Sequence, residues 1–267
     1  MERQFSDVFS RCDPANGVGL VELRRPPHNF FDTALIAAIA DAYEWLDGID
    51  ECRALVLAAE GRSFCAGALF QSDDERATAL DADGNDTVTA SLYSNAVRLL
   101  RTRKPVVAAV HGAAIGGGLG LAVSCDFRVV GPDTRLAANF VKLGISPGFG
   151  LTRMLPRLIG EQRAALLMLT GRRLKGEQAV DWGLADLYCP DTEQVRKRAF
   201  ELAAEIAEGA PLAVESTRAT LRQGLADAIA VQTDHELGEQ TRLRRSEDHA
   251  EGVAAVAERR PGVFRRR

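Results

Sequence analysis

Two glycine-containing turns are the parts of this sequence best suited to chemistry. The first covers residues 64–68 (Phe-Cys-Ala-Gly-Ala), and the second covers residues 111–118 (His-Gly-Ala-Ala-Ile-Gly-Gly-Gly), before an apolar helical segment. Glycine lets a backbone approach a ligand closely, and the first N–H groups of a helix have no partner inside it. Two such groups aimed at one point would form an oxyanion hole, which the dipole of the helix would strengthen. For either turn alone, a tight turn in a packed core is the more common explanation.

The glycines do not match other ligand-binding motifs. A dinucleotide fingerprint that began at Gly116 would need glycine where Leu121 stands, and Gly118 is not followed by the Lys-Ser/Thr of a phosphate-binding loop. None of the four histidines has another at metal-ligand spacing. We therefore expect no metal and no separate cofactor.

Composition excludes several classes of function. The 267 residues include 33 basic and 37 acidic side chains, a net charge of −4, which disfavours nucleic acid as a partner. Five cysteines without a C-x-x-C pair indicate reduced thiols and a cytoplasmic protein, and the charged N-terminus lacks the apolar region of a secretory signal. The apolar stretch 106–125 contains five glycines, so we expect a strand, a turn and a helix there rather than a membrane span.

The elements that would position these turns alternate between strand and helix in the first half of the chain. Apolar runs at 17–23, 53–58, 106–110 and 127–130 predict strands, and helical spacing predicts helices after Asp32, over 88–103 and up to Ser124. Because consecutive parallel strands need a crossover, this order predicts an α/β fold. From residue 151 onward the pattern predicts helices nearly throughout, over 151–159, 162–170, 176–181, 192–208, 212–222, 225–245 and 248–257.

The motifs together resemble the enoyl-CoA hydratase/isomerase (crotonase) superfamily. They are S-F-C-A-G-A, then K-P-V-V-A-A-V-H-G-A-A-I-G-G-G, then C-D-F-R and L-G-I-S-P-G, in the family's order. The resemblance implies a crotonase-like spiral of ββα units with a C-terminal helical trimerisation region. We accordingly divide the chain into a core at 1–200 with the acyl-CoA site and an oligomerisation region at 201–267. It also implies an acyl-CoA thioester as substrate, with coenzyme A as part of that substrate, and a homotrimer or a dimer of trimers.

Carried over residue by residue, the resemblance assigns the oxyanion donors to the backbone N–H groups of Ala68 and Gly117. It places Ala66 and Gly116 beside the ligand and Arg62 near the phosphates of CoA, although a solvated surface arginine is an equally good explanation of Arg62. These donors would hold the thioester oxygen as it becomes enolate-like.

The chain departs from the family at the positions that carry acid–base chemistry. The two glutamates of true hydratases correspond to Gly120 and Phe140, and a third site, acidic in some relatives, corresponds to Gly148. Because a positioned acid or base contributes about 10² to 10⁴ in rate, hydration by two carboxylates is in doubt. Gly120 and Phe140 would instead offer space and apolar surface to a bulkier acyl group.

Other residues offer weaker alternatives for the missing chemistry. A replacement base could come from Asp73, Asp74 or Glu75, although a solvated charge run is the more common explanation. His111 and Cys65 are better explained as structural residues, and the basic end Arg265-Arg266-Arg267 could meet a phosphate. Two functions follow: an enzyme that hydrates or isomerises an enoyl-CoA, or a catalytically silent acyl-CoA-binding oligomer.

Overall fold

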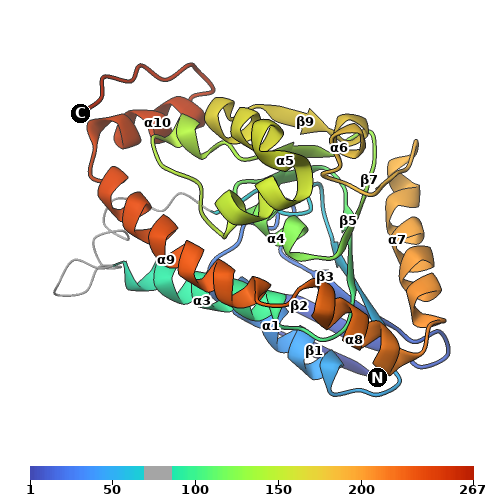
Figure 1. Ribbon diagram of the computed structural model, residues 1–267. Helices are drawn as coiled ribbons and strands as arrows, with labels where there is room; N and C mark the ends of the chain where they lie inside the picture. Colours follow the sequence, from blue (N-terminus) through green and yellow to red (C-terminus); the bar gives the residue numbers. More distant parts are fainter. Residues whose placement is uncertain (69–85) are drawn as a thin grey trace.

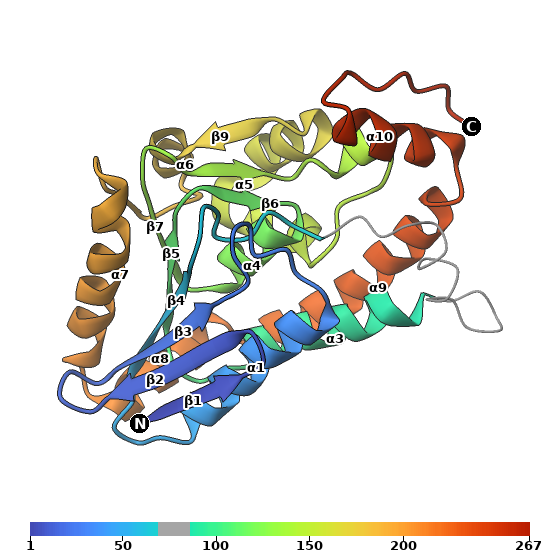
Figure 2. The same ribbon diagram turned by 180° about the vertical axis from the view of Figure 1, so that it is seen from behind.

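The main sheet positions the first glycine turn at the end of a buried strand. The computed structural model describes residues 1–68 and 86–267, and within them this sheet has the order β1-β2-β3-β4-β5-β7-β10 (Figures 1 and 2). The strands from β1 to β3 pair antiparallel, and β1 and β2 are not among the strands predicted from the sequence. The later neighbours pair parallel, as the alternating pattern predicts. The bounds are β1 Glu2–Phe5, β2 Val8–Asp13, β3 Val18–Leu23, β4 Ala54–Ala59, β5 Val106–Val110, β7 Phe127–Val130 and β10 Leu187–Tyr188.

Helices cover both faces of this sheet, so its central strands are apolar on both sides. In β4, Leu55 and Leu57 belong to the core that contains α1 (Thr33–Asp47) and α3 (Thr87–Leu100), whereas Val56 packs toward α7 (Thr192–Ala207). Successive side chains of a strand point to opposite faces, which explains why β4 is a continuous apolar run. As predicted, Asp32 caps α1, because its carboxylate accepts from the N–H of Leu35 at 2.8 Å.

The second glycine turn contains a strand that the sequence pattern did not predict. Strand β6 (Ala113–Ile115) pairs with β8 (Arg135–Ala137), which pairs with β9 (Arg173–Lys175) in a second sheet. Strands β9 and β10 also interrupt the region predicted to be nearly all helical. These strands have two or three residues each, which is too short for hydrophobic periodicity to separate them from turns.

A short helix, α4 (Gly117–Ser124), follows β6 and lies near the centre of the molecule (Figure 1). All eight of its residues are buried, because β6, β7, α3 and α5 (Leu151–Thr170) surround it. The two helices predicted over 151–159 and 162–170 form α5, which is kinked at Gly160 with φ +76°.

The chain ends in helices, as predicted. α6 (Gly176–Trp182) precedes α7, and α8 (Pro211–Leu221), α9 (Leu225–Leu243) and α10 (Glu247–Ala257) follow it. Helix α9 runs beside α3 in both views (Figures 1 and 2). In the described part of the chain, no helix is both long and apolar enough to cross a membrane.

Candidate active site

Cys65 joins the two glycine turns through its main chain. Its N–H donates to the carbonyl of Ala113 at 3.0 Å, and its carbonyl accepts from the N–H of Ile115 at 3.1 Å. The backbones then approach closely, since a Cβ atom on Gly118 would lie 2.0 Å from the Cys65 carbonyl oxygen and one on Gly67 would lie 2.9 Å from that of Ile115. Glycine at 67 and 118 is therefore required for the two turns to pack together.

The predicted donor amides of Ala68 and Gly117 lie on these two turns. Gly117 is the first residue of α4, and Ala68 is exposed and forms an isolated parallel bridge with Phe31. Within residues 1–68 and 86–267, neither amide N–H donates a hydrogen bond. The N-terminal end of α4 also contributes partial positive charge beside Gly117. Both N–H groups are thus available to an acceptor from outside the chain.

Three phenylalanine rings surround the first turn of α4. The ring of Phe31 would lie 2.2 Å from a Cβ atom on Gly117, and the ring of Phe140 would lie 3.6 Å from one on Gly116. Phe149 packs edge-on against Phe31, with ring centroids 5.8 Å apart. All three side chains are buried in the main core. The site is therefore apolar on this side.

Phe149 also occupies the space beside Gly120. A Cβ atom on Gly120 would lie 2.5 Å from this ring, so the open space that the glycine implied is filled. Phe149 adopts φ +63°, a left-handed conformation that is uncommon for a bulky residue. Such a conformation persists only where the surroundings hold it in place.

Tyr93 of α3 and Gln240 of α9 hold the turn that carries Phe149. The Tyr93 hydroxyl donates to Oε1 of Gln240 at 3.0 Å, and Nε2 of Gln240 donates to the carbonyl of Ser146 at 2.9 Å. A Cβ atom on Gly148 would lie 1.8 Å from that hydroxyl, so Tyr93 occupies the place of a side chain at 148. Burial raises the pKa of Tyr93, which keeps its hydroxyl protonated.

Arg244, directly after α9, and Glu236 of α9 make further polar contacts around this turn. Arg244 donates to Gln240 Oε1 at 3.1 Å and pairs with Asp86, whose carboxylate caps α3. Glu236 accepts from the N–H groups of Gly150 at 2.7 Å and Thr152 at 3.1 Å. Burial raises the pKa of Glu236, although the Thr152 hydroxyl and the two N–H groups oppose that effect. This carboxylate therefore satisfies backbone donors at the start of α5.

The other predicted residues lie at or beside the two turns, Arg62 and Ala66 at the first and Gly116 and His111 at the second. Arg62 is exposed and its N–H donates to the carbonyl of Pro27 at 2.7 Å, and Ala66 donates to the carbonyl of His28 at 3.0 Å. The N–H of Gly116 donates to the carbonyl of Ala137 at 2.8 Å, so it is not a free donor. Nε2 of His111 lies 3.1 Å from the carbonyl oxygen of Gly61.

Three further candidates from the sequence remain: the Cys65 thiol, the basic C-terminal end and the acidic run at 73–75. Cys65 is fully buried and burial raises its pKa to about 12, so its thiol is unreactive. In the C-terminal end, the N–H groups of Arg265 and Arg266 donate to the carboxylate of Asp248. The candidate bases Asp73, Asp74 and Glu75 lie outside the described residues.

Sequence reasoning missed Phe31, Phe149, Tyr93, Glu236 and Gln240. A signal was available only for Glu236 and Gln240, because polar residues recur at helical spacing, with Thr233, on the face of α9 that also carries Ile229. Within the described ranges, no group of three or more His, Cys, Asp or Glu side chains is arranged to hold a metal ion.

Comparison with known proteins identifies the family and the fold. The family model described as enoyl-CoA hydratase/isomerase matches residues 13–267. A probable enoyl-CoA hydratase of Bacillus subtilis is 30% identical over 93% of this chain and 95% of that protein. The 1,2-epoxyphenylacetyl-CoA isomerase of Escherichia coli is 32% identical over the same shares. A crystal structure of an enoyl-CoA hydratase/isomerase from Pseudoalteromonas atlantica superimposes with a TM-score of 0.83 at 27% identity, covering 97% of this chain and all of that one. The chain therefore belongs to the enoyl-CoA hydratase/isomerase family and has the crotonase fold.

Proposed function

We propose that this protein binds an acyl-CoA thioester and stabilises its enolate with the N–H groups of Ala68 and Gly117. The observation that carries the proposal is the main-chain contact through Cys65, which brings the two turns together, while the N–H groups of Ala68 and Gly117 have no acceptor among the described residues. As a base removes a proton from the acyl chain, negative charge moves onto the thioester oxygen, to which both amide N–H groups would donate hydrogen bonds. One such donor is typically worth 10² to 10³ in rate.

We propose double-bond isomerisation of an enoyl-CoA rather than hydration as the reaction. In isomerisation one proton leaves one carbon of the acyl chain and another returns at a different carbon, so no water is consumed. Hydration needs polar groups that hold a water molecule, whereas positions 120 and 140 present the rings of Phe149 and Phe140. The same apolar lining favours a hydrophobic acyl group.

The reaction can be tested with crotonyl-CoA and longer enoyl-CoAs in deuterated water. We expect double-bond migration with deuterium incorporation into the acyl chain, and little hydroxyacyl-CoA. Rapid formation of hydroxyacyl-CoA would contradict the preference for isomerisation. The candidate bases Asp73, Asp74 and Glu75 are tested by the triple variant D73N/D74N/E75Q, which should lose about 10² to 10⁴ in rate if one of these side chains removes the proton.

A test of the two proposed donors requires a substitution that removes the backbone N–H without adding atoms. A proline at 117 would collide with Phe31, because even a Cβ atom there lies 2.2 Å from its ring. Replacing Ala68 or Gly117 by the corresponding hydroxy acid converts the amide to an ester and preserves the shape. We expect each ester to slow turnover by about 10² to 10³. The matched control is an ester at Leu212, an exposed residue in the first turn of α8. Unchanged turnover in both site esters would exclude these donors.

A catalytically silent acyl-CoA-binding protein is the second candidate. The observation that favours it is the filling of all three acid–base positions, since Phe149 covers Gly120, Phe140 is itself a ring and Tyr93 covers Gly148. Saturable binding of acyl-CoA with no migration, hydration or deuterium exchange would establish this function instead.

The proposed assembly is a homotrimer or a dimer of trimers formed through residues 201–267. Exposed Leu212, Leu221 and Val231 on α8 and α9 support it, because they leave apolar surface for a second copy. Light scattering should give three or six times the 28.8 kDa chain mass, and a monomer would contradict the assembly. The five free, buried cysteines support a reducing compartment, which we propose to be the cytoplasm.

A further inference from the structure

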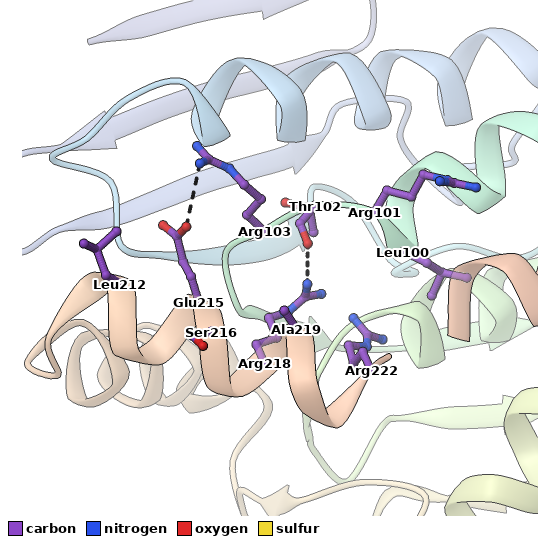
Figure 3. A pocket seen from close by; sticks show the side chains of 10 residues that line it. All are labelled: Leu100, Arg101, Thr102, Arg103, Leu212, Glu215, Ser216, Arg218, Ala219 and Arg222. Atoms are coloured by element: carbon purple, nitrogen blue, oxygen red, sulfur yellow. Dashed lines mark hydrogen bonds and ion pairs between the residues drawn. The ribbon is translucent and has the colours of Figure 1, made fainter. Parts of the chain in front are cut away.

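A cavity of about 390 Å³ lies outside the acyl site, between α8 and the segment that joins α3 to β5. Figure 3 shows the four arginines that line it: Arg101 and Arg103 from the joining segment, Arg218 from α8, and Arg222 directly after α8. The acidic side chain in its lining is Glu215, which lies 3.8 Å from Arg103. The cavity therefore has a strongly cationic wall.

Two of these arginines are buried and share one carboxylate. Nε of Arg218 lies 2.8 Å from Oδ2 of Asp126, and Nη1 of Arg222 lies 3.2 Å from Oδ1 of the same residue. The exposed fractions of the side chains are 8% for Arg218, 9% for Arg222 and 12% for Asp126. Two cations against one anion leave one positive charge that is not balanced within this buried group.

Backbone carbonyls satisfy only part of the two guanidinium groups. Arg218 donates to the carbonyl of Thr102, and Nη2 of Arg222 donates to the carbonyl of Ser124 at 2.7 Å. Nη2 of Arg218 and Nη1 of Arg222 are buried without a hydrogen-bond partner among the described residues, since Nη1 faces Asp126 outside bonding geometry. Burial also lowers the pKa of Arg222, which reflects the cost of keeping its charge there.

The charges at the rim do not supply the missing anion. Arg101 pairs with Asp227 at 2.9 Å, and Arg103 approaches both Glu215 and the Asp47 carbonyl. Arg157 of α5 donates to the carbonyl of Leu221 at 3.2 Å and adds a further positive charge near Arg222. A buried charge is stable only when it is paired and hydrogen-bonded.

We infer that this cavity binds a small oxyanion of the phosphate class beside Arg218 and Arg222, whose single shared carboxylate leaves one positive charge unbalanced. The fork of N–H donors on a guanidinium matches phosphate oxygens, and charge-assisted hydrogen bonds of this kind are among the strongest in proteins. The site lies at the opposite end of α4 from Gly117, because Arg222 contacts Ser124, the last residue of that helix. It therefore does not depend on the proposed acyl-CoA chemistry.

The test measures thermal unfolding of the intact protein in inorganic phosphate and in sodium chloride of equal ionic strength. We expect phosphate to raise the Tm saturably and chloride to leave it nearly unchanged. In Arg222→Met the apparent affinity for phosphate should fall about 10- to 100-fold, because one charge-assisted donor is lost. The matched control is Arg242→Met, which removes an exposed α9 arginine paired with Glu239 and should keep the full response.

A second readout does not depend on ligand affinity. Without phosphate, Arg222→Met should unfold at the same temperature as the unchanged protein or higher, since it removes an unbalanced buried charge. In saturating phosphate the unchanged protein should unfold at a higher temperature than Arg222→Met. If Arg222→Met does not fold, Arg222→Gln replaces it in both measurements.

Two outcomes would overturn the inference. An equal rise in Tm for the unchanged protein and Arg222→Met would mean that phosphate acts elsewhere. No phosphate response, together with dissociation of the oligomer by Arg222→Met, would assign the cavity to a carboxylate of a second copy of the chain.

Discussion

The ring of Phe149 lies where a side chain at Gly120 would extend, with 2.5 Å between the ring and the position of a Cβ atom. These two residues come from different elements, the turn before α5 and the interior of α4. The size of the side chain at either position therefore limits the size of the side chain at the other.

Gly120→Ala tests this relationship through stability. We expect a net loss of about 1–2 kcal/mol, because overpacking costs about 1–3 kcal/mol while alanine recovers up to about 1 kcal/mol of helix propensity. In Phe149→Gly both the ring and the Cβ atom of residue 149, which lies 2.8 Å from the same position, are gone, so adding Gly120→Ala should cost little or nothing. Urea unfolding of the two single variants and the double variant measures the coupling. Additive losses would show that the ring does not restrict position 120.

The left-handed backbone of Phe149 predicts an inverted order of glycine and alanine variants. Both Phe149→Ala and Phe149→Gly lose the packing of the ring, but glycine adopts φ +63° without strain. Phe149→Gly should therefore be the more stable of the two, by up to about 1 kcal/mol. Phe64, also fully buried but without a positive φ, is the matched control, where glycine should be the less stable variant. The same order at both positions in chemical unfolding would contradict the prediction.

Glu236 predicts a specific dependence of stability on pH. Burial raises its pKa above 4.5 in the folded state, so the folded protein binds this proton more tightly than the unfolded chain. Its contribution is fully present below the unfolded pKa and is lost as pH rises through the folded pKa. The unfolding free energy of the unchanged protein should thus fall relative to that of Glu236→Gln as the pH rises above about 4.5.

The matched control for this pH dependence lies three residues further on. Arg242 lowers the pKa of the exposed Glu239, so the contribution of Glu239 has the opposite sign and is lost as pH falls. Glu239→Gln should show a weak trend in that direction. A rising rather than falling difference for Glu236→Gln would exclude the raised pKa.

Arg62→Ala tests the predicted contact with the phosphates of CoA. Because Arg62 is exposed, we expect KM for acyl-CoA to rise about two- to fivefold with kcat unchanged, which is the signature of lost uniform binding. The effect should shrink at high salt, and Arg62→Lys should retain most of the affinity. An unchanged KM at low salt would identify Arg62 as an ordinary surface residue.

The sequence predicted the parallel core and the positions of the two glycine turns because both depend on local patterns. Apolar runs such as 106–110 and the capping residue Asp32 have the same meaning wherever they occur. The motif order also located Ala68 and Gly117, whose turns are in contact. The strands β6, β8, β9 and β10 were missed because they contain too few residues for a period to be recognised. Strands β1 and β2 were also missed, because their residues are partly exposed and polar and form no apolar run.

The lining of the site could not be predicted from the sequence, because it is assembled from distant segments. Phe31, Tyr93, Phe149 and Gln240 come from four different parts of the chain, and a phenylalanine or a buried polar residue has no pattern that marks it as part of a site. Gly120 likewise suggested open space, because the sequence does not show which distant side chain lies beside it. What fills that space is decided by the left-handed turn at Phe149, which only tertiary contacts could specify.

The hydrogen bonds of Cys65 have a consequence for solvent exchange. The amide hydrogens of Cys65 and Ile115 lie in the bridge between the two turns, so they should exchange with deuterium only when the core opens as a whole. The amide of Ala68, three residues away and exposed, should exchange within the folded state. The spacing of the two turns would thus persist through local fluctuations and disappear only with global unfolding.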